Sequence, residues 1–430
     1  MPATSVVVAS MIGSGIFMTT GKVGPLLVSP GNVLAAWLFA GLFALGGAIC
    51  LAELGAMLPR SGGSYIFAKR AYGARIGCFV GYEAMMIAFP ATIAVISVVM
   101  AEYLAALLPG GSVRLVAVLG LLVVTAIHCR GTSFGAKINS IGALLKLTLL
   151  ICFVVFGFYC AISVPAVSAL ALSLPNTPPP TAPGIWSSEF ASAVIIVSFS
   201  YVGWNNVTML GGEIKRPERN IPFSILGGVT VVTILYLLIN LVFMRAVHPT
   251  AMVDSSGEPT STIGYMVAEH LFPGWVADLL GWGILFLIIS TLISVVLAGG
   301  RMAYAMALSG QMPARLGRLN QDGSPVAALL LQAAITVVLI AMFDVRQMLL
   351  FSGLSGMLSS VLVIGAVIVL RIRKPHLVRP FRLPLFPLPA VITLVLALWL
   401  MWQTAVGNPT ELKASAVVVG GLALLAAVRK

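Results

Sequence analysis

The fold of this chain is decided by the sequence MIGSGIF, which runs from Met11 to Phe17. Two glycines flank a serine in an otherwise apolar segment, and this pattern predicts that a membrane-spanning helix unwinds there. Unwound backbone is tolerated inside a membrane only where protein covers it or a polar cavity adjoins it, because its N–H and C=O groups need partners. The freed N–H groups, with the start of the half-helix that follows, favour a carboxylate ligand.

Composition predicts an integral membrane protein of the all-α class. Of 430 residues, 59% are hydrophobic and 9% are charged, whereas about 25% are charged in soluble proteins. The mean hydropathy is +1.06. A spanning helix needs about 20 apolar residues, and we expect twelve transmembrane helices. They are predicted at Thr4–Leu26, Val33–Leu58, Ile76–Leu107, Val113–Cys129, Ala136–Ile162, Ala191–Leu210, Ile221–Val247, Trp275–Leu308, Val326–Phe343, Met348–Leu370, Leu385–Val406 and Ala414–Val428.

The net charge of +12 is distributed unevenly across the membrane. If the N-terminus is cytoplasmic, most basic residues lie inside, and Lys146 falls within the membrane. The basic residues predicted outside are Lys22, Arg114, Arg245, Arg346 and Lys413. This asymmetry agrees with the positive-inside rule. We therefore expect a multi-pass protein of the plasma membrane or bacterial inner membrane, with both termini cytoplasmic, in contact with the lipid bilayer and with no nucleic acid.

A second interruption lies five spans later, in the sequence FSYVGWNN from Phe199 to Asn206. Interrupted segments at corresponding positions of two halves indicate an inverted-repeat transporter with its binding site at the midplane. We expect one transmembrane domain over residues 1–430, with repeat one at about 1–162, repeat two at about 188–371 and additional helices at about 385–428. Opposed broken helices offer N–H groups on one side and carbonyl groups on the other, which suits the two charges of an α-amino acid.

At these residues the chain resembles the amino acid-polyamine-organocation superfamily, and within it the L-amino acid transporter branch. The motifs that carry the resemblance are GSGIF at Gly13–Phe17, AELG at Ala52–Gly55, PRSGGSY at Pro59–Tyr65, GWNN at Gly203–Asn206, EIKRPERNIP at Glu213–Pro222, YAMA at Tyr304–Ala307 with Arg301 before it, and MP at Met312–Pro313. The resemblance implies a leucine transporter-type fold, in which a 5+5 inverted repeat with broken first and sixth helices is followed by two C-terminal helices. It also implies transport of amino acids rather than enzymatic activity.

The resemblance implies where the substrate carboxylate binds. In that family, N–H and hydroxyl groups of the first-helix break hold it, and these correspond to Ser14 and Gly15, with Ile16 beside them. The competing interpretation is that Gly13 and Gly15 only allow close packing of helices. The second interruption at the repeat-related position favours the binding site.

The same resemblance implies that carbonyl groups at the two breaks bind the substrate α-ammonium. The corresponding residues are Met11, Phe199, Ser200 and Val202. An aromatic side chain before the sixth-helix break closes the site in relatives, and this role falls to Phe199, although an aromatic residue in a span is commonly a packing residue. Asn205 matches a position whose amide lies near the ligand or steadies the broken helix.

Lys146 lies deep in the fifth predicted span, where an ionisable group is a functional candidate. In several sodium-independent relatives, a lysine of the fifth helix occupies the place of a sodium ion. The resemblance implies that the Lys146 ammonium binds carbonyl groups near Gly13 and the hydroxyls of Thr291 and Ser294. It either stays charged, as a substitute for sodium in an exchanger, or loads and releases a proton in a proton-coupled permease. A purely structural lysine is the third alternative.

The predicted function is sodium-independent transport of neutral L-amino acids, because no acidic residue is evident at the breaks to receive a cationic side chain. The Ser352-Gly353 and Ser355-Gly356 pairs in the tenth span indicate either a flexible polar segment near the cavity or close helix packing. A sodium-coupled symporter conflicts with Lys146. A sensor that binds an amino acid without transporting it is the other alternative.

Other classes of protein fit the sequence less well. A channel would show pore-lining polar or charged repeats, and an intramembrane enzyme would show a motif such as HExxH or GxSxG, neither of which occurs. We expect no cofactor and no metal. The loop from Pro109 to Ser112 lacks the cysteine that joins animal relatives to a glycoprotein, so no disulfide-linked heavy chain is expected. The residues before Gly13 form about 18 Å of helix, less than in relatives, and we expect a truncated or misassigned start.

Overall fold

Helices make up most of the part of the chain that the structure describes. This computed structural model describes residues 3–59, 63–131, 133–163, 181–209, 214 and 216–428. Within those ranges, the β-type pairing is limited to an isolated bridge between Val253 and Pro259. The predicted all-α class is therefore confirmed.

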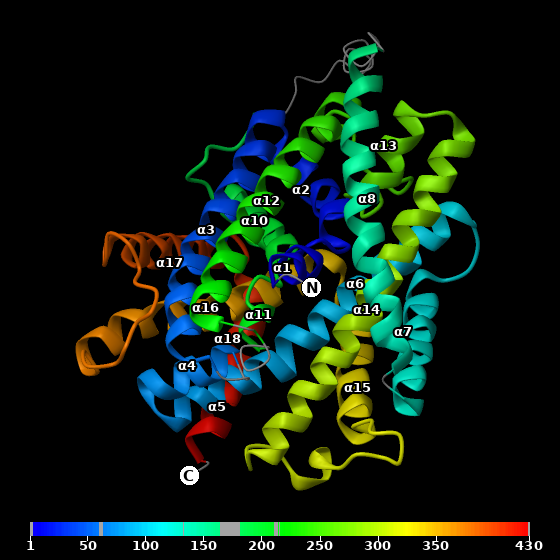
Figure 1. Cartoon of the computed structure of the whole chain (residues 1–430). Coiled ribbons are helices and arrows are strands. Elements are labelled where there is room, and N and C mark those ends of the chain that lie inside the picture. Colours follow the sequence, from blue (N-terminus) through cyan, green and yellow to red (C-terminus); the bar gives the residue numbers. More distant parts are fainter. Residues whose placement is uncertain are drawn as a thin grey trace.

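The first half of the chain contains the first interrupted helix and the long helices that surround it (Figure 1). Its elements are α1 (Ala3–Met11), the 3₁₀ turn η1 (Gly15–Phe17), α2 (Thr19–Leu27), α3 (Pro30–Met57), α4 (Gly63–Tyr72), α5 (Ala74–Glu83), the π-helical turn η2 (Ala84–Ala88), α6 (Phe89–Leu107), α7 (Val113–Arg130) and α8 (Ser133–Ser163).

The second half contains the second interrupted helix. Its elements are α10 (Ser188–Ser198), the 3₁₀ turn η4 (Phe199–Tyr201), α11 (Asn206–Met209), α12 (Pro217–Ala246), η5 (Pro249–Ala251), α13 (Ile263–Leu271), α14 (Gly274–Leu308), η6 (Ala314–Gly317), α15 (Val326–Met342), α16 (Val345–Arg373), α17 (Leu388–Gly407) and α18 (Pro409–Val428).

Eight helices of the described residues are long and apolar enough to cross a membrane. They are α3, the continuous segment Ala74–Leu107, α7, α12, α14, α16, α17 and Pro409–Ala427 of α18. Shorter apolar helices occur at Leu145–Cys160, Ser188–Tyr201 and Val326–Met342. The chain is therefore a multi-pass membrane protein, while the full set of twelve spans and their repeat relationship stay predictions.

Both predicted interruptions are present in the structure. After α1, residues 12–14 lie outside any helix, and η1 connects them to α2. After α10, η4 leads into a turn over residues 202–205 before α11 begins. Glycine at these positions favours a turn because it lacks a side chain and its backbone is free to leave the helical conformation. Serine and asparagine favour a turn because their side chains can form hydrogen bonds with the nearby backbone.

The tenth predicted span is a helix that continues through both Ser-Gly pairs. A β-carbon placed at Gly353 would collide with the Ile195 side chain of α10. Ser355 donates a hydrogen bond to Glu83 of α5. The structure therefore shows close packing at Gly353, whereas a β-carbon placed at Gly356 would meet nothing within 4 Å.

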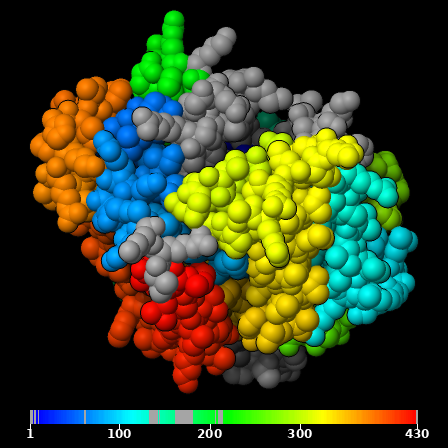
Figure 2. Space-filling model, turned by 90° about the horizontal axis from the view of Figure 1, so that it is seen from below, coloured from blue at the N-terminus to red at the C-terminus, as the bar shows by residue number. Residues whose placement is uncertain are grey.

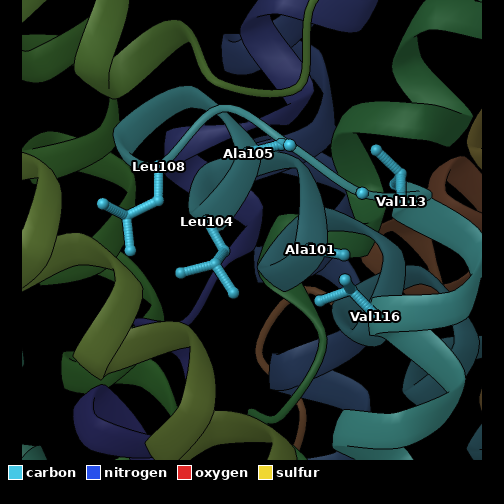
Figure 3. Close-up of a pocket in the computed structure, with 8 residues that line it drawn as sticks. Ala101, Leu104, Ala105, Leu108, Val113 and Val116 are labelled. Atoms are coloured by element: carbon cyan, nitrogen blue, oxygen red, sulfur yellow. The ribbon is translucent and has the colours of Figure 1, made fainter.

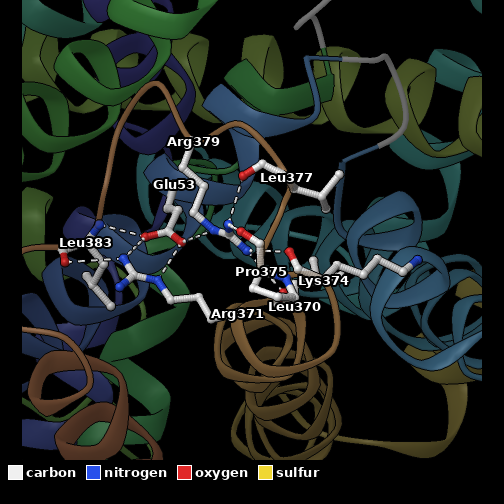
Figure 4. Close-up of polar contacts among 8 residues, drawn as sticks. All are labelled: Glu53, Leu370, Arg371, Lys374, Pro375, Leu377, Arg379 and Leu383. Atoms are coloured by element: carbon white, nitrogen blue, oxygen red, sulfur yellow. Dashed lines mark hydrogen bonds and ion pairs between the residues drawn. The ribbon is translucent and has the colours of Figure 1, made fainter.

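A buried ion-pair cluster joins the end of α3 to the end of α16 (Figure 4). Glu53 is 1% exposed and accepts hydrogen bonds from Arg371 Nε at 2.9 Å and Arg371 Nη2 at 2.5 Å. The backbone N–H of Leu383 donates to the same carboxylate at 2.6 Å, and Arg379 Nε lies 3.4 Å from it. The ends of α3 and α16 thus meet at one end of the molecule, as the predicted topology requires.

The lower face of the molecule in Figure 1 is seen directly in Figure 2. It shows blue atoms of α4 and α5, yellow atoms of the segment that follows α14, and red atoms of α18. The C-terminal end of the chain lies on this side, whereas the helix labelled α1 lies near mid-height in Figure 1.

A cavity of about 110 Å³ lies between the end of α6 and the start of α7 (Figure 3). Its labelled lining side chains are all apolar: Ala101, Leu104, Ala105, Leu108, Val113 and Val116. No residue of either interruption lines this cavity. It is therefore not a candidate for the amino acid site.

Candidate functional site

The two helix interruptions lie in direct contact. A β-carbon placed at Gly15 would stand 2.6 Å from Ser200 Oγ and 2.7 Å from Ser200 Cα. The hydroxyl of Thr19 donates to the Gly15 carbonyl at 2.9 Å and also lies 2.9 Å from Ser200 Oγ. Only glycine fits at position 15 without displacing the second interruption.

A second close approach joins the end of α1 to the turn before α11. Gly203 has a φ of +119°, a conformation that L-residues rarely adopt. A β-carbon at this position would lie 2.6 Å from the Ser10 carbonyl oxygen. Glycine at 203 therefore satisfies both the backbone conformation and the packing of the two broken helices.

Consecutive backbone N–H groups at the first interruption have no hydrogen-bond partner among the described residues. Ile12 N–H donates to Val8 O and Phe17 N–H donates to Ser14 O, but the N–H groups from Gly13 to Ile16 donate to nothing. Ser14 is 2% exposed and Ile16 is fully buried. Buried N–H groups without partners are unusual, and a concave group of them is suited to bind an anion.

Tyr236 of α12 bridges the two interruptions. Its hydroxyl lies 2.8 Å from the Met11 carbonyl oxygen and 3.1 Å from the Ser200 carbonyl oxygen, and donates to both. The ring packs against Trp37 and Tyr201, with both centroid distances at 5.3 Å. Tyr236 was not among the predicted site residues. In the sequence it is a single tyrosine inside an apolar span, and no motif marks it as part of the site.

The Tyr236 contact bears on the predicted ammonium site. Met11 and Ser200 are two of the residues whose carbonyl groups were predicted to bind the ammonium, and here each accepts the same hydroxyl hydrogen. A carbonyl oxygen has two lone pairs, so each retains room for a second donor. The structure brings these two carbonyl groups to one place, and their role toward a ligand stays a prediction.

The remaining predicted residues of the second interruption lie in its turn. Phe199 is half-buried, and its carbonyl accepts the Val202 N–H at 3.2 Å. The Val202 side chain is 56% exposed. The Asn205 carbonyl accepts both the N–H and the hydroxyl of Thr208, at 3.0 and 2.7 Å, and so begins α11. The gate role of Phe199 and the ligand contact of Asn205 stay predictions.

Lys146 of α8 is buried, with 3% of its surface exposed. Among the residues that the structure describes, none forms a hydrogen bond or ion pair with its ammonium group. Of its predicted partners, Thr291 lies beside the first interruption, because a β-carbon on Gly13 would be 3.3 Å from Thr291 Cγ2. The hydroxyls of Thr291 and Ser294 each donate to a carbonyl group of α14 at 2.8 Å. The predicted contacts of Lys146 with the first interruption, Thr291 and Ser294 stay predictions.

Comparison with known proteins places this chain in a family of amino acid permeases. The family model described as amino acid permease matches residues 2–424, and the chain belongs to that family, within the amino acid-polyamine-organocation superfamily. The predicted family is thereby confirmed.

Several characterised relatives are similar along most of their length. The serine/threonine exchanger SteT of Bacillus subtilis is 26% identical over 409 residues, covering 94% of this chain and 90% of that protein. The mouse b(0,+)-type amino acid transporter 1 is 26% identical over 412 residues, which cover 94% of this chain and 81% of that transporter. The human large neutral amino acids transporter small subunit 2 is 26% identical over 416 residues, which cover 92% of this chain and 75% of that subunit.

Proposed function

We propose that this protein is a sodium-independent secondary transporter of neutral L-amino acids, which works by alternating access as an exchanger or a proton-coupled permease. The observation that carries the proposal is the set of N–H groups of the buried residues Ser14, Gly15 and Ile16, which have no partner among the described residues and lie next to Ser200 of the second interruption. The proposal includes twelve spans in a 5+5 leucine transporter-type repeat, with both termini cytoplasmic in a cell membrane.

In this proposal, the substrate carboxylate binds to the first interruption. The N–H groups of Ser14, Gly15 and Ile16 and the Ser14 hydroxyl supply the hydrogen bonds. Hydrogen bonds from several N–H groups to one anion are stronger than neutral ones, and burial strengthens them further. A ligand carboxylate would therefore satisfy N–H groups for which the described residues supply no partner.

The substrate ammonium binds to the carbonyl groups that Tyr236 brings together. The Met11 and Ser200 carbonyls accept one hydroxyl hydrogen between them in this structure, and each keeps a lone pair for an N–H of the ligand. The Phe199 and Val202 carbonyls complete the predicted set. Recognition of both charges selects α-amino acids over simple carboxylates or amines.

Neutral substrates are favoured by the charges near the two interruptions. No acidic side chain of the described residues forms a hydrogen bond with Gly15, Ser200 or Tyr236. The relatives include a serine/threonine exchanger and a large neutral amino acids transporter, by their names. Both observations support a neutral side chain on the substrate.

Sodium independence rests on Lys146. Lys146 is buried, and the family resemblance predicts that its ammonium takes the place of a sodium ion. A positive charge at that place would repel sodium. Two alternatives keep the same site: a sodium-coupled symporter, and a membrane sensor that binds an amino acid without transporting it.

Uptake into proteoliposomes tests the proposal. Purified protein is reconstituted into vesicles with or without internal unlabelled serine, and uptake of labelled serine, alanine, leucine and arginine is followed with and without sodium or a pH gradient. We expect uptake of the neutral amino acids that sodium does not increase. Binding without any uptake would contradict transport and support the sensor.

The site itself is tested by Gly15→Leu, which should abolish binding of labelled serine. The matched control is Gly420→Leu, at an exposed glycine of α18 where an added β-carbon meets nothing within 4 Å. Unchanged affinity in Gly15→Leu would refute the proposed carboxylate site.

A further inference from the structure

Glu83 is a buried carboxylate that the proposed amino acid site does not use. It is the last residue of α5, lies within the candidate span Ala74–Leu107 and is 3% exposed. Its oxygens accept hydrogen bonds from two hydroxyls of α16, Ser355 Oγ at 3.1 Å and Ser359 Oγ at 2.7 Å. In the described part of the chain, the polar partners of this carboxylate are therefore neutral.

A comparison with Glu53 shows that Glu83 lacks a basic partner among the described residues. Glu53 is equally buried, but Arg371 and Arg379 compensate its charge. No described cation forms an ion pair with Glu83. An ionised carboxylate without a cation is costly in the membrane interior, and two hydroxyl donors offset only part of that cost. The neutral acid is therefore the favoured form in this conformation, and the ionised form requires an arrangement that admits water.

The neighbouring titratable groups do not supply the missing charge. Along its own helix, Tyr82 donates to the Gln311 carbonyl. Among the described residues, the hydrogen bonds to the Glu83 carboxylate come from Ser355 and Ser359. No bond to it is formed by the other titratable or charged groups of its own helix and the helices around it, which are Arg75 and Cys78 on α5, Tyr65, Lys69, Arg70 and Tyr72 on α4, Arg301 and Tyr304 on α14, Arg346, Arg371 and Arg373 on α16, and Glu411 and Lys413 on α18. Protonation of Glu83 itself is thus the available way to neutralise it.

The local backbone and the packing of α16 connect Glu83 to the second interruption. The π-helical turn η2 begins at the next residue, and such turns are frequent at functional sites. Ser355 and Ser359 lie on one side of α16, one helical turn apart. On another side of α16, Gly353 packs against Ile195, one turn before Phe199. A change in the bonds to Glu83 would therefore move a helix that packs directly on the interrupted helix.

We propose that Glu83 is the proton-binding residue of a proton-coupled amino acid permease. This inference rests on the proposed transport function. Of the two proposed transport modes, exchange and proton coupling, it selects proton coupling. A proton from outside binds the Glu83 carboxylate and forms an O–H bond, and the neutral acid then accompanies the amino acid through the conformational change. The O–H bond breaks when the carboxyl meets cytoplasmic water, and one proton enters with each substrate molecule. Glu83 is a coupling residue and does not touch the amino acid.

The test compares Glu83→Gln, a permanent analogue of the neutral acid, with the wild-type protein in serine-transporting proteoliposomes. An inward gradient of one pH unit can support about tenfold accumulation of substrate. We expect the wild type to accumulate serine under this gradient. We expect Glu83→Gln to exchange internal for external serine within twofold of the wild-type rate, while its accumulation falls to the equilibrium level. Glu258→Gln, in an exposed loop, is the matched control and should accumulate serine normally.

The outcomes separate this inference from the transport function. Gradient-driven accumulation by Glu83→Gln would overturn the role of Glu83. Exchange by the wild type without any response to the gradient would also overturn it, and would leave transport intact. Absence of both exchange and accumulation in the wild type would refute transport itself.

A second variant covers the case in which Glu83→Gln does not fold. Ser355→Ala combined with Ser359→Ala removes the hydroxyls that stabilise the ionised carboxylate and keeps the acid. We expect the pH profile of serine accumulation to shift to higher pH by about one unit, with exchange at saturating serine preserved. An unshifted profile would overturn the proposal.

Discussion

Gly15 and Ser200 lie so close that a β-carbon on Gly15 would stand 2.7 Å from the Ser200 α-carbon. The contact joins two interruptions that are almost two hundred residues apart in the chain. It shows why the first interruption needs a glycine there: the space that a side chain would occupy is filled by the backbone of the second.

Gly15→Ala is expected to weaken substrate binding even though it adds a single methyl group. Overpacking of this kind costs about 1–3 kcal/mol. If this cost falls on the conformation that binds substrate, the affinity falls by about 5- to 150-fold. Binding of labelled serine to purified protein measures the effect. Gly420→Ala is the control, and equal affinity in the two variants would contradict the packing argument.

Tyr236→Phe is expected to lower both thermal stability and substrate affinity, because it removes the hydroxyl between the Met11 and Ser200 carbonyls. Loss of a buried hydrogen-bond partner costs about 1–3 kcal/mol. Tyr72→Phe is the control, since the Tyr72 hydroxyl also donates to a backbone carbonyl, that of Leu362, away from the interruptions. We expect the control to lose stability alone. A loss of affinity in both variants would mean that the effect is general.

Glu53→Gln is expected to destabilise the protein. The substitution removes the negative charge that compensates Arg371 and Arg379. Removing one partner of a fully buried ion pair costs about 3–5 kcal/mol. We expect a smaller loss of stability here, because Arg371 is partly exposed. The unfolding midpoint in detergent, followed by tryptophan fluorescence, measures the loss. Glu258→Gln should leave the midpoint unchanged, and the same midpoint in both variants would exclude a stabilising role for the cluster.

Lys146→Met is expected to reduce transport by about tenfold or more, equivalent to 1.4 kcal/mol, in both sodium and choline media. The variant keeps the length of the side chain and removes its charge. Wild-type uptake should be equal in the two media. Normal transport by Lys146→Met would assign the lysine a structural role, and uptake that requires sodium in the wild type would contradict sodium independence.

Asp254, in the segment between α12 and α13, should make stability depend on acid pH. Partial burial opposes ionisation, but hydrogen bonds from the Ser256 hydroxyl and from the N–H groups of Ser256 and Glu258 hold the pKa of Asp254 below its usual value. A lowered folded-state pKa stabilises the protein above the unfolded-state pKa of about 4, and this stability is lost as pH falls through the folded value. The unfolding midpoint of Asp254→Asn should therefore fall less than that of the wild type between pH 5 and pH 3.

Much of the fold could be predicted from sequence because its signals are local. Apolar segments of sufficient length gave helices whose bounds fall within a few residues of the predicted spans. The two interruptions were predicted at Gly13–Gly15 and near Ser200–Asn205 because glycine, serine and asparagine weaken a helix wherever they occur. The family could also be predicted, since its motifs are short and ordered along the chain.

The contacts between distant helices could not be predicted in the same way. Such features depend on which helix faces meet. They include the Tyr236 hydrogen bonds, the hydrogen bonds of Glu83 with Ser355 and Ser359, and the absence of described partners around Lys146. In a span that is apolar on every side, hydrophobic periodicity does not distinguish those faces.

The sequence by itself determined that this chain crosses the membrane, that two of its helices unwind, and which family it belongs to. The packing of the helices was needed to show that the interruptions touch at Gly15 and Ser200, that one tyrosine hydroxyl joins their carbonyl groups, and that no cation of the described residues pairs with the buried Glu83. The physical reason is that apolar length and helix breaking act within a few residues, whereas close approach and charge compensation arise only when separate helices pack together.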